Sequence, residues 1–189
     1  MKLHFRPYIR YKFFNSLFTG AVGGSVFTIY GALNPSTFSV GGIILALGLM
    51  GMAYIYHYLM EIKYFFLISL GAEMIMLLMI GFFLLFPQYQ MTALIVYGAY
   101  QLSFIFGGYL VRSETHFARK ARMMGWIDIA KQQGYLAGLL ASWLFYKGLE
   151  YYGILAATSQ VYWLHVVLII LELAIILFLL VAFRSKQRA

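Results

Sequence analysis

Long apolar runs alternate with short polar breaks along the whole chain. A helix needs about 20 mostly apolar residues to cross the hydrocarbon core of a bilayer. Runs of this kind occupy residues 13–33, 39–60, 63–86, 90–111, 122–147 and 161–183. They are apolar on every face and longer than the alternating strands of about ten residues that form transmembrane barrels. The pattern predicts an all-α membrane protein with six transmembrane helices in a single domain, 1–189.

Composition agrees with this class of protein. Hydrophobic residues make up 63% of the chain and charged residues only 11%, whereas soluble domains carry about 25% charged residues. The chain has no cysteine, so disulfides, thiolate metal sites and cysteine nucleophiles are excluded. It also lacks a phosphate-binding glycine loop, a zinc-binding histidine pair and a nucleophile elbow. We therefore expect no enzyme activity, no cofactor and no metal.

Basic residues are distributed unevenly between the two sides of the predicted bundle. If the six helices alternate in direction, one side carries twelve basic residues, and the other carries Lys147 alone. The twelve are Lys2, Arg6, Arg10, Lys12, Lys63, Arg112, Arg119, Lys120, Arg122, Arg184, Lys186 and Arg188. The positive-inside rule then predicts that both termini are cytoplasmic, in a bacterial inner membrane. This distribution explains the net charge of +8 without nucleic acid, and we expect contacts with anionic lipid headgroups.

The two halves of the chain share a weak internal similarity. Residues 48–51 (Gly-Leu-Met-Gly) resemble residues 138–141 (Gly-Leu-Leu-Ala). The third predicted helix has one acid, Glu73, and the sixth has one acid, Glu172. This suggests two three-helix units of opposite membrane orientation, an arrangement found in many secondary transporters.

Several motifs resemble the amino-terminal six-helix half of a major facilitator superfamily transporter. The first helix is rich in glycine, Glu61 and Lys63 occupy the loop that carries the family's signature, and a basic segment precedes a glycine-rich fifth helix. Tyr97 or Tyr100 stands where the family has an arginine in its fourth helix. The further matching residues are Gly20, Gly23, Gly24, Gly31, 39–42, 119–122 and 134–138.

The resemblance implies a half-size transporter. Members of this family place two six-helix halves around one cavity, so we expect a homodimer, with a heterodimer of two different halves as the alternative. The second and fifth helices would face the partner, and the first and fourth would line the cavity. The glycines of the second and fifth helices are compatible with this interface, and they are equally compatible with packing within one subunit. We expect a secondary transporter of a small solute or ion that works by alternating access; the alternative is a non-transporting scaffold or assembly subunit.

Three polar residues fall at similar depth in the predicted helices. At a rise of about 1.5 Å per residue, Glu73, Gln101 and Glu172 all lie near the middle of the membrane. Ionisable groups at this depth are costly and are often functional. Glu73 and Glu172 are therefore candidates for proton coupling, and Gln101 for substrate binding. The alternative is a protonated carboxyl group with a purely structural hydrogen bond.

The predicted fifth helix holds a second polar group. Asp128 and Lys131 are three residues apart and can pair on one helix face. With Gln132 they are candidates for binding an anionic substrate, and Gln133 and Arg112 are candidates for a cytoplasmic gate. The alternatives are a paired structural network and, for Arg112, a side chain that reaches lipid headgroups.

Aromatic and histidine side chains complete the set of candidates. Because the resemblance places the first and fourth helices at the cavity, Tyr30, Tyr97 and Tyr100 are candidates for substrate contact. His57 and His165 fall near opposite membrane surfaces, so they are not expected to share a haem or a metal ion. Each is expected to be an interfacial side chain.

Overall fold

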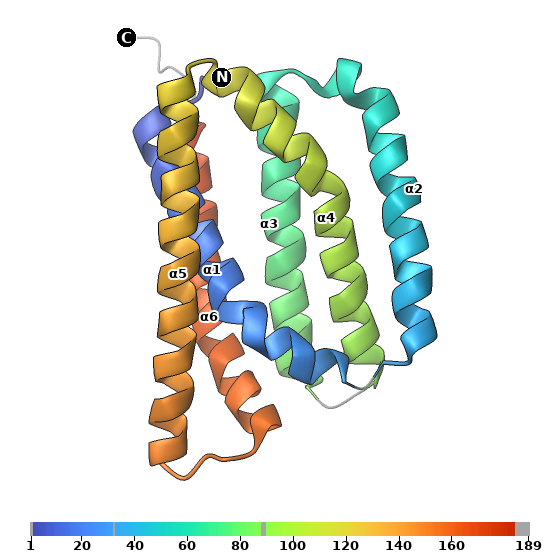
Figure 1. Ribbon diagram of the computed structural model, residues 1–189, viewed down its shortest axis with the longest axis vertical. Coiled ribbons are helices and arrows are strands. Elements are labelled where there is room, and N and C mark those ends of the chain that lie inside the picture. Colours follow the sequence, from blue (N-terminus) through green and yellow to red (C-terminus); the bar gives the residue numbers. More distant parts are fainter. Residues whose placement is uncertain (1, 32, 88–89, 184–189) are drawn as a thin grey trace.

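The computed structural model describes residues 2–31, 33–87 and 90–183, which form a bundle of long helices that alternate in direction along the chain (Figure 1). The helices are α1 (Phe5–Tyr30), α2 (Pro35–Leu59), α3 (Ile62–Leu85), α4 (Gln90–Ala118), α5 (Ala121–Tyr151) and α6 (Ala157–Ala182). The expected all-α class is confirmed.

Four of these helices, α2, α3, α4 and α6, are long and apolar enough to cross a membrane. The chain is therefore compatible with an integral membrane protein. Helices α1 and α5 have sufficient length but are less apolar, because they carry polar side chains such as Lys12 and Lys131.

Two helix boundaries differ by about two helical turns from those expected from hydropathy. Helix α1 begins at Phe5 rather than residue 13, and α4 continues to Ala118 rather than ending at residue 111. The stretch 112–118, expected in a loop, is therefore helical. Hydropathy marks only the apolar part of a helix, whereas backbone hydrogen bonds continue as long as polar side chains find partners. Helix α4 ends where Arg119 takes a left-handed conformation with φ of 54°.

The helices pack in two groups. Helix α1 packs on α5 and α6, α4 packs on α2 and α3, and α3 and α6 join the two groups along the middle. Figure 1 shows α5 and α2 at opposite edges of the bundle. Helix α2 contributes only Gly41 and Met52 to the buried residues of the described chain. Most of its surface is thus available to lipid or to a partner.

Glycines bring α1 and α5 unusually close together. A Cβ atom at Gly134 would lie 2.1 Å from the carbonyl oxygen of Phe13, and one at Gly138 would lie 2.1 Å from that of Leu17. Small residues of this kind allow membrane helices to touch along their backbones. The two α5 glycines therefore serve packing within the subunit.

The glycines of α2 are divided between two environments. A Cβ atom at Gly41 would collide with the ring of Tyr97, and one at Gly48 would collide with Ile105, both on α4. A Cβ atom at Gly42 or Gly51, in contrast, would have no described neighbour within 4 Å. Packing within the subunit therefore explains Gly41 and Gly48, whereas it does not explain Gly42 and Gly51.

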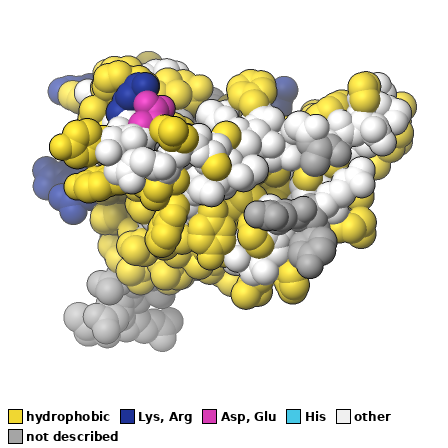
Figure 2. Space-filling view, turned by 90° about the horizontal axis from the view of Figure 1, so that it is seen from below, with side chains coloured by type: hydrophobic (Ala, Val, Ile, Leu, Met, Phe, Trp, Pro, Cys, Tyr) yellow, Lys and Arg dark blue, Asp and Glu magenta, His cyan; other side chains and the backbone are white. Residues whose placement is uncertain are grey.

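The beginning and the end of the bundle meet. The backbone N–H of His4 donates to the carbonyl oxygen of Ala182 at 2.8 Å. The α2–α3 and α4–α5 connections lie at this same end (Figure 1). Figure 2 looks at the opposite end, where hydrophobic and uncharged side chains cover most of the face.

Candidate functional site

A stripe of polar side chains runs along one face of α1. Tyr8, Tyr11, Lys12 and Asn15 follow the pattern i, i+3, i+4, i+7, which places them on one side of a helix. The first three are buried and Asn15 is half-buried. Since α1 lies inside the bundle, these groups require polar partners on other helices.

Glu114 of α4 supplies one set of partners. Its Oε2 atom lies 2.7 Å from Nζ of Lys12 and accepts a hydrogen bond of 2.8 Å from the Tyr8 hydroxyl. Its Oε1 atom accepts a hydrogen bond from Nζ of Lys131 on α5. Lys131 is also 3.6 Å from Asp128, whose side chain is 71% exposed. One buried carboxylate therefore connects three helices.

The formal charges of this cluster balance. Lys12 and Lys131 carry two positive charges, and Glu114 and Asp128 carry two negative charges. Charges that leave water are tolerated only when each is paired and hydrogen-bonded. Each member of the cluster is paired with an opposite charge, so it has no unbalanced charge in the ionised state.

Glu73 of α3 supplies the second set of partners. Its Oε1 atom accepts hydrogen bonds from the Tyr11 hydroxyl at 2.5 Å and from the Asn15 amide at 3.0 Å. Glu172 of α6 lies beside Glu73 and is fully buried. Neither carboxyl oxygen of Glu172 has a hydrogen-bond partner among the residues that the structure describes. The two acids form a carboxyl pair between α3 and α6.

Such a pair favours a bound proton. Two adjacent carboxylates in a medium of low dielectric constant repel each other strongly, so they do not both ionise easily. A single proton shared between them would leave one negative charge. Lys12 is close enough to Glu73 for their charges to interact and to partly offset it.

The stripe on α1 connects the carboxyl pair to the Glu114 cluster. The rings of Tyr8 and Tyr11 are 5.6 Å apart, and Nζ of Lys12 lies 5.5 Å from each ring centre. Polar groups therefore lie next to one another from the exposed Asp128 to the buried Glu172. We name this series the polar chain; its members are Asp128, Lys131, Glu114, Tyr8, Lys12, Tyr11, Asn15, Glu73 and Glu172.

The tyrosine candidates lie beyond the carboxyl pair. Tyr100 interacts electrostatically with both Glu172 and Tyr30, but its hydroxyl has no hydrogen-bond partner in the described part of the chain. The ring of Tyr30 makes an edge contact with that of Tyr97, with centres 5.3 Å apart. These three residues form an aromatic group next to the polar chain.

The remaining glutamine candidates lie elsewhere. Gln101 and Tyr97 line a cavity of about 440 Å³ between α2 and α4, and Oε1 of Gln101 is buried without a partner among the described residues. Gln132 and Gln133 are exposed on α5. Neither belongs to the polar chain that includes Asp128 and Lys131.

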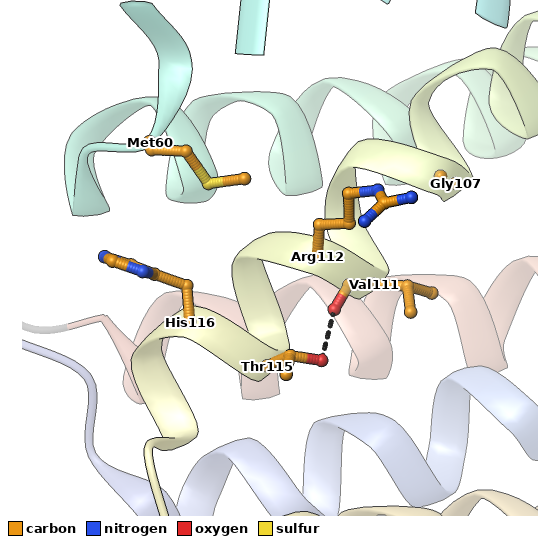
Figure 3. Close-up of a pocket in the computed structure, with 7 residues that line it drawn as sticks. Met60, Gly107, Val111, Arg112, Thr115 and His116 are labelled. Atoms are coloured by element: carbon orange, nitrogen blue, oxygen red, sulfur yellow. Dashed lines mark hydrogen bonds between the residues drawn. The ribbon is translucent and has the colours of Figure 1, made fainter. Parts of the chain in front are cut away.

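Arg112 lies in a separate groove at the end of α4. The groove has a volume of about 800 Å³ and includes Met60 and His116. Figure 3 shows these side chains around one opening, where the Thr115 hydroxyl donates to the Val111 carbonyl. The Arg112 guanidinium lies 6.0 Å from the ring of Tyr56, and no acid of the described chain pairs with it. Arg112 therefore stands apart from the Asp128–Lys131 pair.

The histidines differ from each other. His57 is in the last turn of α2, with its ring centre 3.8 Å from that of Tyr58. His165 is only 1% exposed, with Nδ1 2.8 Å from the Val161 carbonyl oxygen. The expectation that His165 is interfacial is wrong, because α6 turns this residue into the core. Within the described ranges, no cluster of three or more His, Asp or Glu residues suits a metal ion.

Sequence reasoning missed five members of the polar chain: Tyr8, Tyr11, Lys12, Asn15 and Glu114. Hydropathy assigns Lys12 to a basic leading segment and Glu114 to a loop. A signal was present in the three- and four-residue spacing of the α1 stripe. A second signal was that Glu114 is the single acid in the basic stretch 112–122.

No protein-family model, curated protein or solved structure matches this chain.

Proposed function

We propose that this protein is a proton-coupled secondary transporter of the inner membrane, working as a homodimer of six-helix halves. The observation that carries the proposal is Glu172, a fully buried carboxyl group without a hydrogen-bond partner among the described residues, next to a second acid. A buried ionisable group costs about 2.5–3.5 kcal/mol at the centre of a membrane helix. Reversible proton binding would explain why the chain keeps an acid at this position despite that cost.

The packing of the helices supports six spans in two inverted repeats. If the first three helices are exchanged with the last three, the contact of α1 with α5 becomes that of α4 with α2, and α1 with α6 becomes α4 with α3. The α3–α6 contact maps onto itself. The two acids of the carboxyl pair lie on α3 and α6, which correspond to each other in this exchange. Inverted repeats place equivalent groups of this kind at one interface.

The edges of the bundle support a dimer that resembles a complete major facilitator transporter. Helices α2 and α5 lie at opposite edges (Figure 1), so a two-fold axis can bring α2 of one subunit to α5 of the other. Gly42 and Gly51 on α2 are open to such a neighbour. The exposed Asp128 and Gln132 of α5 would then face an aqueous space between the subunits rather than lipid.

In this scheme one subunit rocks against the other between states open to either side, and the two packed groups within each subunit shift with this movement. The Glu114 cluster lies at the end that the positive-inside rule assigns to the cytoplasm. The carboxyl pair exchanges its proton with whichever side is open. Substrate contacts are assigned to Asp128, Lys131, Gln132, Gln101, Tyr30, Tyr97 and Tyr100, and gating to Arg112 and Gln133.

Proteoliposomes with an interior pH dye test the proposal. Classes of small solutes, such as sugars, amino acids, organic acids, organic cations and inorganic ions, are added in turn under an imposed pH gradient. At least one class should carry protons inward in the native protein and not in Glu172→Gln. The matched control is Glu150→Gln, which removes an exposed acid paired with Lys147. If no class moves and none stabilises the protein, a non-transporting scaffold replaces the proposal.

Cysteine cross-linking tests the dimer. The native chain has no cysteine, so Leu47→Cys on α2 and Leu140→Cys on α5 introduce the sole thiols. Both positions are exposed, and the double variant should form cross-linked dimers in membranes. Leu177→Cys on α6, equally exposed, should stay monomeric. Equal cross-linking at all positions would contradict this interface.

A further inference from the structure

We propose that Lys12 is a movable counter-ion that leaves Glu114 for Glu73 when the carboxyl pair loses its last shared proton. This movement deepens the proposed function and rests on it, because it gives a means by which proton release opens the bundle. Only an O–H bond of the carboxyl pair breaks, and the proton leaves to water on the open side.

The position of Lys12 permits this exchange. Its ammonium group is in contact with Glu114 at 2.7 Å and also interacts with the charge of Glu73. It lies equally far from the rings of Tyr8 and Tyr11, each of which donates a hydrogen bond to one of the two acids. A lysine side chain has a flexible stem of four carbons, so it can change partners without a movement of the backbone.

The surroundings of Glu73 leave Lys12 as the available cation. The groups that face Glu73 are Tyr8, Tyr11, Lys12 and Asn15 from α1 and Glu172 from α6. Tyr100 of α4 faces Glu172. Within the described residues, Lys12 is the one positive charge in this set. Additional negative charge on the carboxyl pair therefore attracts Lys12 in particular.

Glu114 tolerates the departure of Lys12. It retains the ion pair with Lys131 and the hydrogen bond from Tyr8. Lys131, in turn, is shared with Asp128. The cluster is thus not left with an isolated carboxylate, which lowers the cost of the exchange.

The exchange has a mechanical effect. Helix α1 belongs to the group with α5 and α6, whereas α4 belongs to the group with α2 and α3. The Lys12–Glu114 ion pair therefore crosses between the two groups. When Lys12 turns to Glu73, one of these cross-connections is lost near the end of the bundle and is replaced by one at its middle.

Infrared difference spectroscopy of the protein in lipid nanodiscs tests the exchange, because it follows the protonated carboxyl band during a pH titration. The band is assigned through its loss in Glu172→Gln. In Lys12→Met the titration midpoint should move upward by on the order of one pH unit or more, because a cation near a carboxylate favours ionisation. In Glu114→Gln it should move downward, since Lys12 is then free for Glu73. Lys12→Arg should restore the native midpoint.

The control is Lys147→Met, which removes an exposed lysine paired with Glu150 and should leave the midpoint within a few tenths of a pH unit. Equal shifts in Lys12→Met and Lys147→Met, or no shift in either Lys12→Met or Glu114→Gln, would overturn the proposal. If Lys12→Met does not fold, the downward shift in Glu114→Gln decides the question.

Spin labels at Arg10→Cys on α1 and Thr115→Cys on α4 add a second measurement, since both positions are exposed. The distance between them should increase over the same pH interval, and a constant distance would refute the mechanical effect. The two proposals fail separately. If Lys12→Met and Glu114→Gln shift the midpoint in opposite directions but no solute moves, the transport proposal is wrong and the exchange stands. If proton-driven flux occurs and is unaltered in Lys12→Met, transport stands and the exchange is wrong.

Discussion

Glu172 lies beside Glu73, yet the two carboxyl groups have unequal surroundings. Glu73 accepts hydrogen bonds from Tyr11 and Asn15, whereas Glu172 accepts none from the described residues. Replacement of Glu73 by leucine leaves the buried Tyr11 hydroxyl and the half-buried Asn15 amide without an acceptor, and each buried donor left in this way costs about 1–3 kcal/mol. Glu172→Leu removes an acid that accepts no hydrogen bond from a described donor, and it leaves both donors of Glu73 satisfied. We therefore expect a lower unfolding temperature in Glu73→Leu and an unchanged or higher one in Glu172→Leu, measured in detergent. Equal destabilisation would contradict the unequal surroundings of the two acids.

The Glu114 cluster gives a second prediction about stability. Glu114→Gln leaves Lys12 and Lys131 without their shared carboxylate, and removal of one partner from a buried ion pair costs about 3–5 kcal/mol. Asp128→Asn, which alters an exposed partner at 3.6 Å, should cost far less. Denaturant titrations of the two variants make the comparison. A cost for Asp128→Asn as large as that for Glu114→Gln would contradict the central place of Glu114.

Close packing of α1 and α5 gives a third prediction. Gly138→Ala places a methyl group 2.1 Å from the Leu17 carbonyl oxygen and must push the helices apart, so we expect it to destabilise the fold strongly. Gly125→Ala, on the same helix with no neighbour within 4 Å, should stabilise it by up to about 1 kcal/mol through helix propensity. Thermal unfolding of both proteins distinguishes a local clash from a general effect of alanine.

The groove of Arg112 predicts a lipid preference. Its guanidinium has no acidic partner in the described chain and lies near Met60 at the end of the bundle. An anionic phosphate headgroup at that level is worth about 1 kcal/mol per basic residue. Phosphatidylglycerol should raise the unfolding temperature relative to phosphatidylcholine, and Arg112→Gln should reduce that difference. Arg6→Gln is the control for general surface charge; an equal reduction there would make the groove irrelevant.

The orientation of the chain can be tested by single-cysteine labelling in intact cells. Lys120→Cys lies between α4 and α5, and Thr158→Cys lies at the start of α6, at the opposite end of the bundle. A membrane-impermeant maleimide should modify position 158 and spare position 120 until the membrane is permeabilised. The reverse pattern would invert the assigned orientation.

The sequence was sufficient to predict how far along its helix each of the two acids lies, but not that the two helices bring them together. The rise per residue is constant, so counting from the helix ends places Glu73 and Glu172 near the middle of their spans. Their proximity, however, depends on the packing of α3 on α6. Sequence alone does not determine it, because apolar helices offer several faces of similar hydrophobicity.

Lys12 and Glu114 illustrate a different limit. Both lie outside the apolar runs, and hydropathy assigns such residues to flanking segments. The contacts of the cluster join distant parts of the chain: Tyr8 and Glu114 are separated by 106 positions. A helix that extends beyond its apolar part is stabilised by these long-range partners, which become visible only in three dimensions. Glycines show the same limit, since close approach was expected but the neighbouring helix was not.

The hydrogen bond between His4 and Ala182 has a consequence for how such a molecule can be enlarged. Because the chain enters and leaves the bundle at one end, a second copy can be fused in tandem through a short linker that needs no additional crossing. A duplicated gene would then encode both subunits of the proposed dimer in one polypeptide, and each copy would be free to diverge while the other preserved the shared architecture.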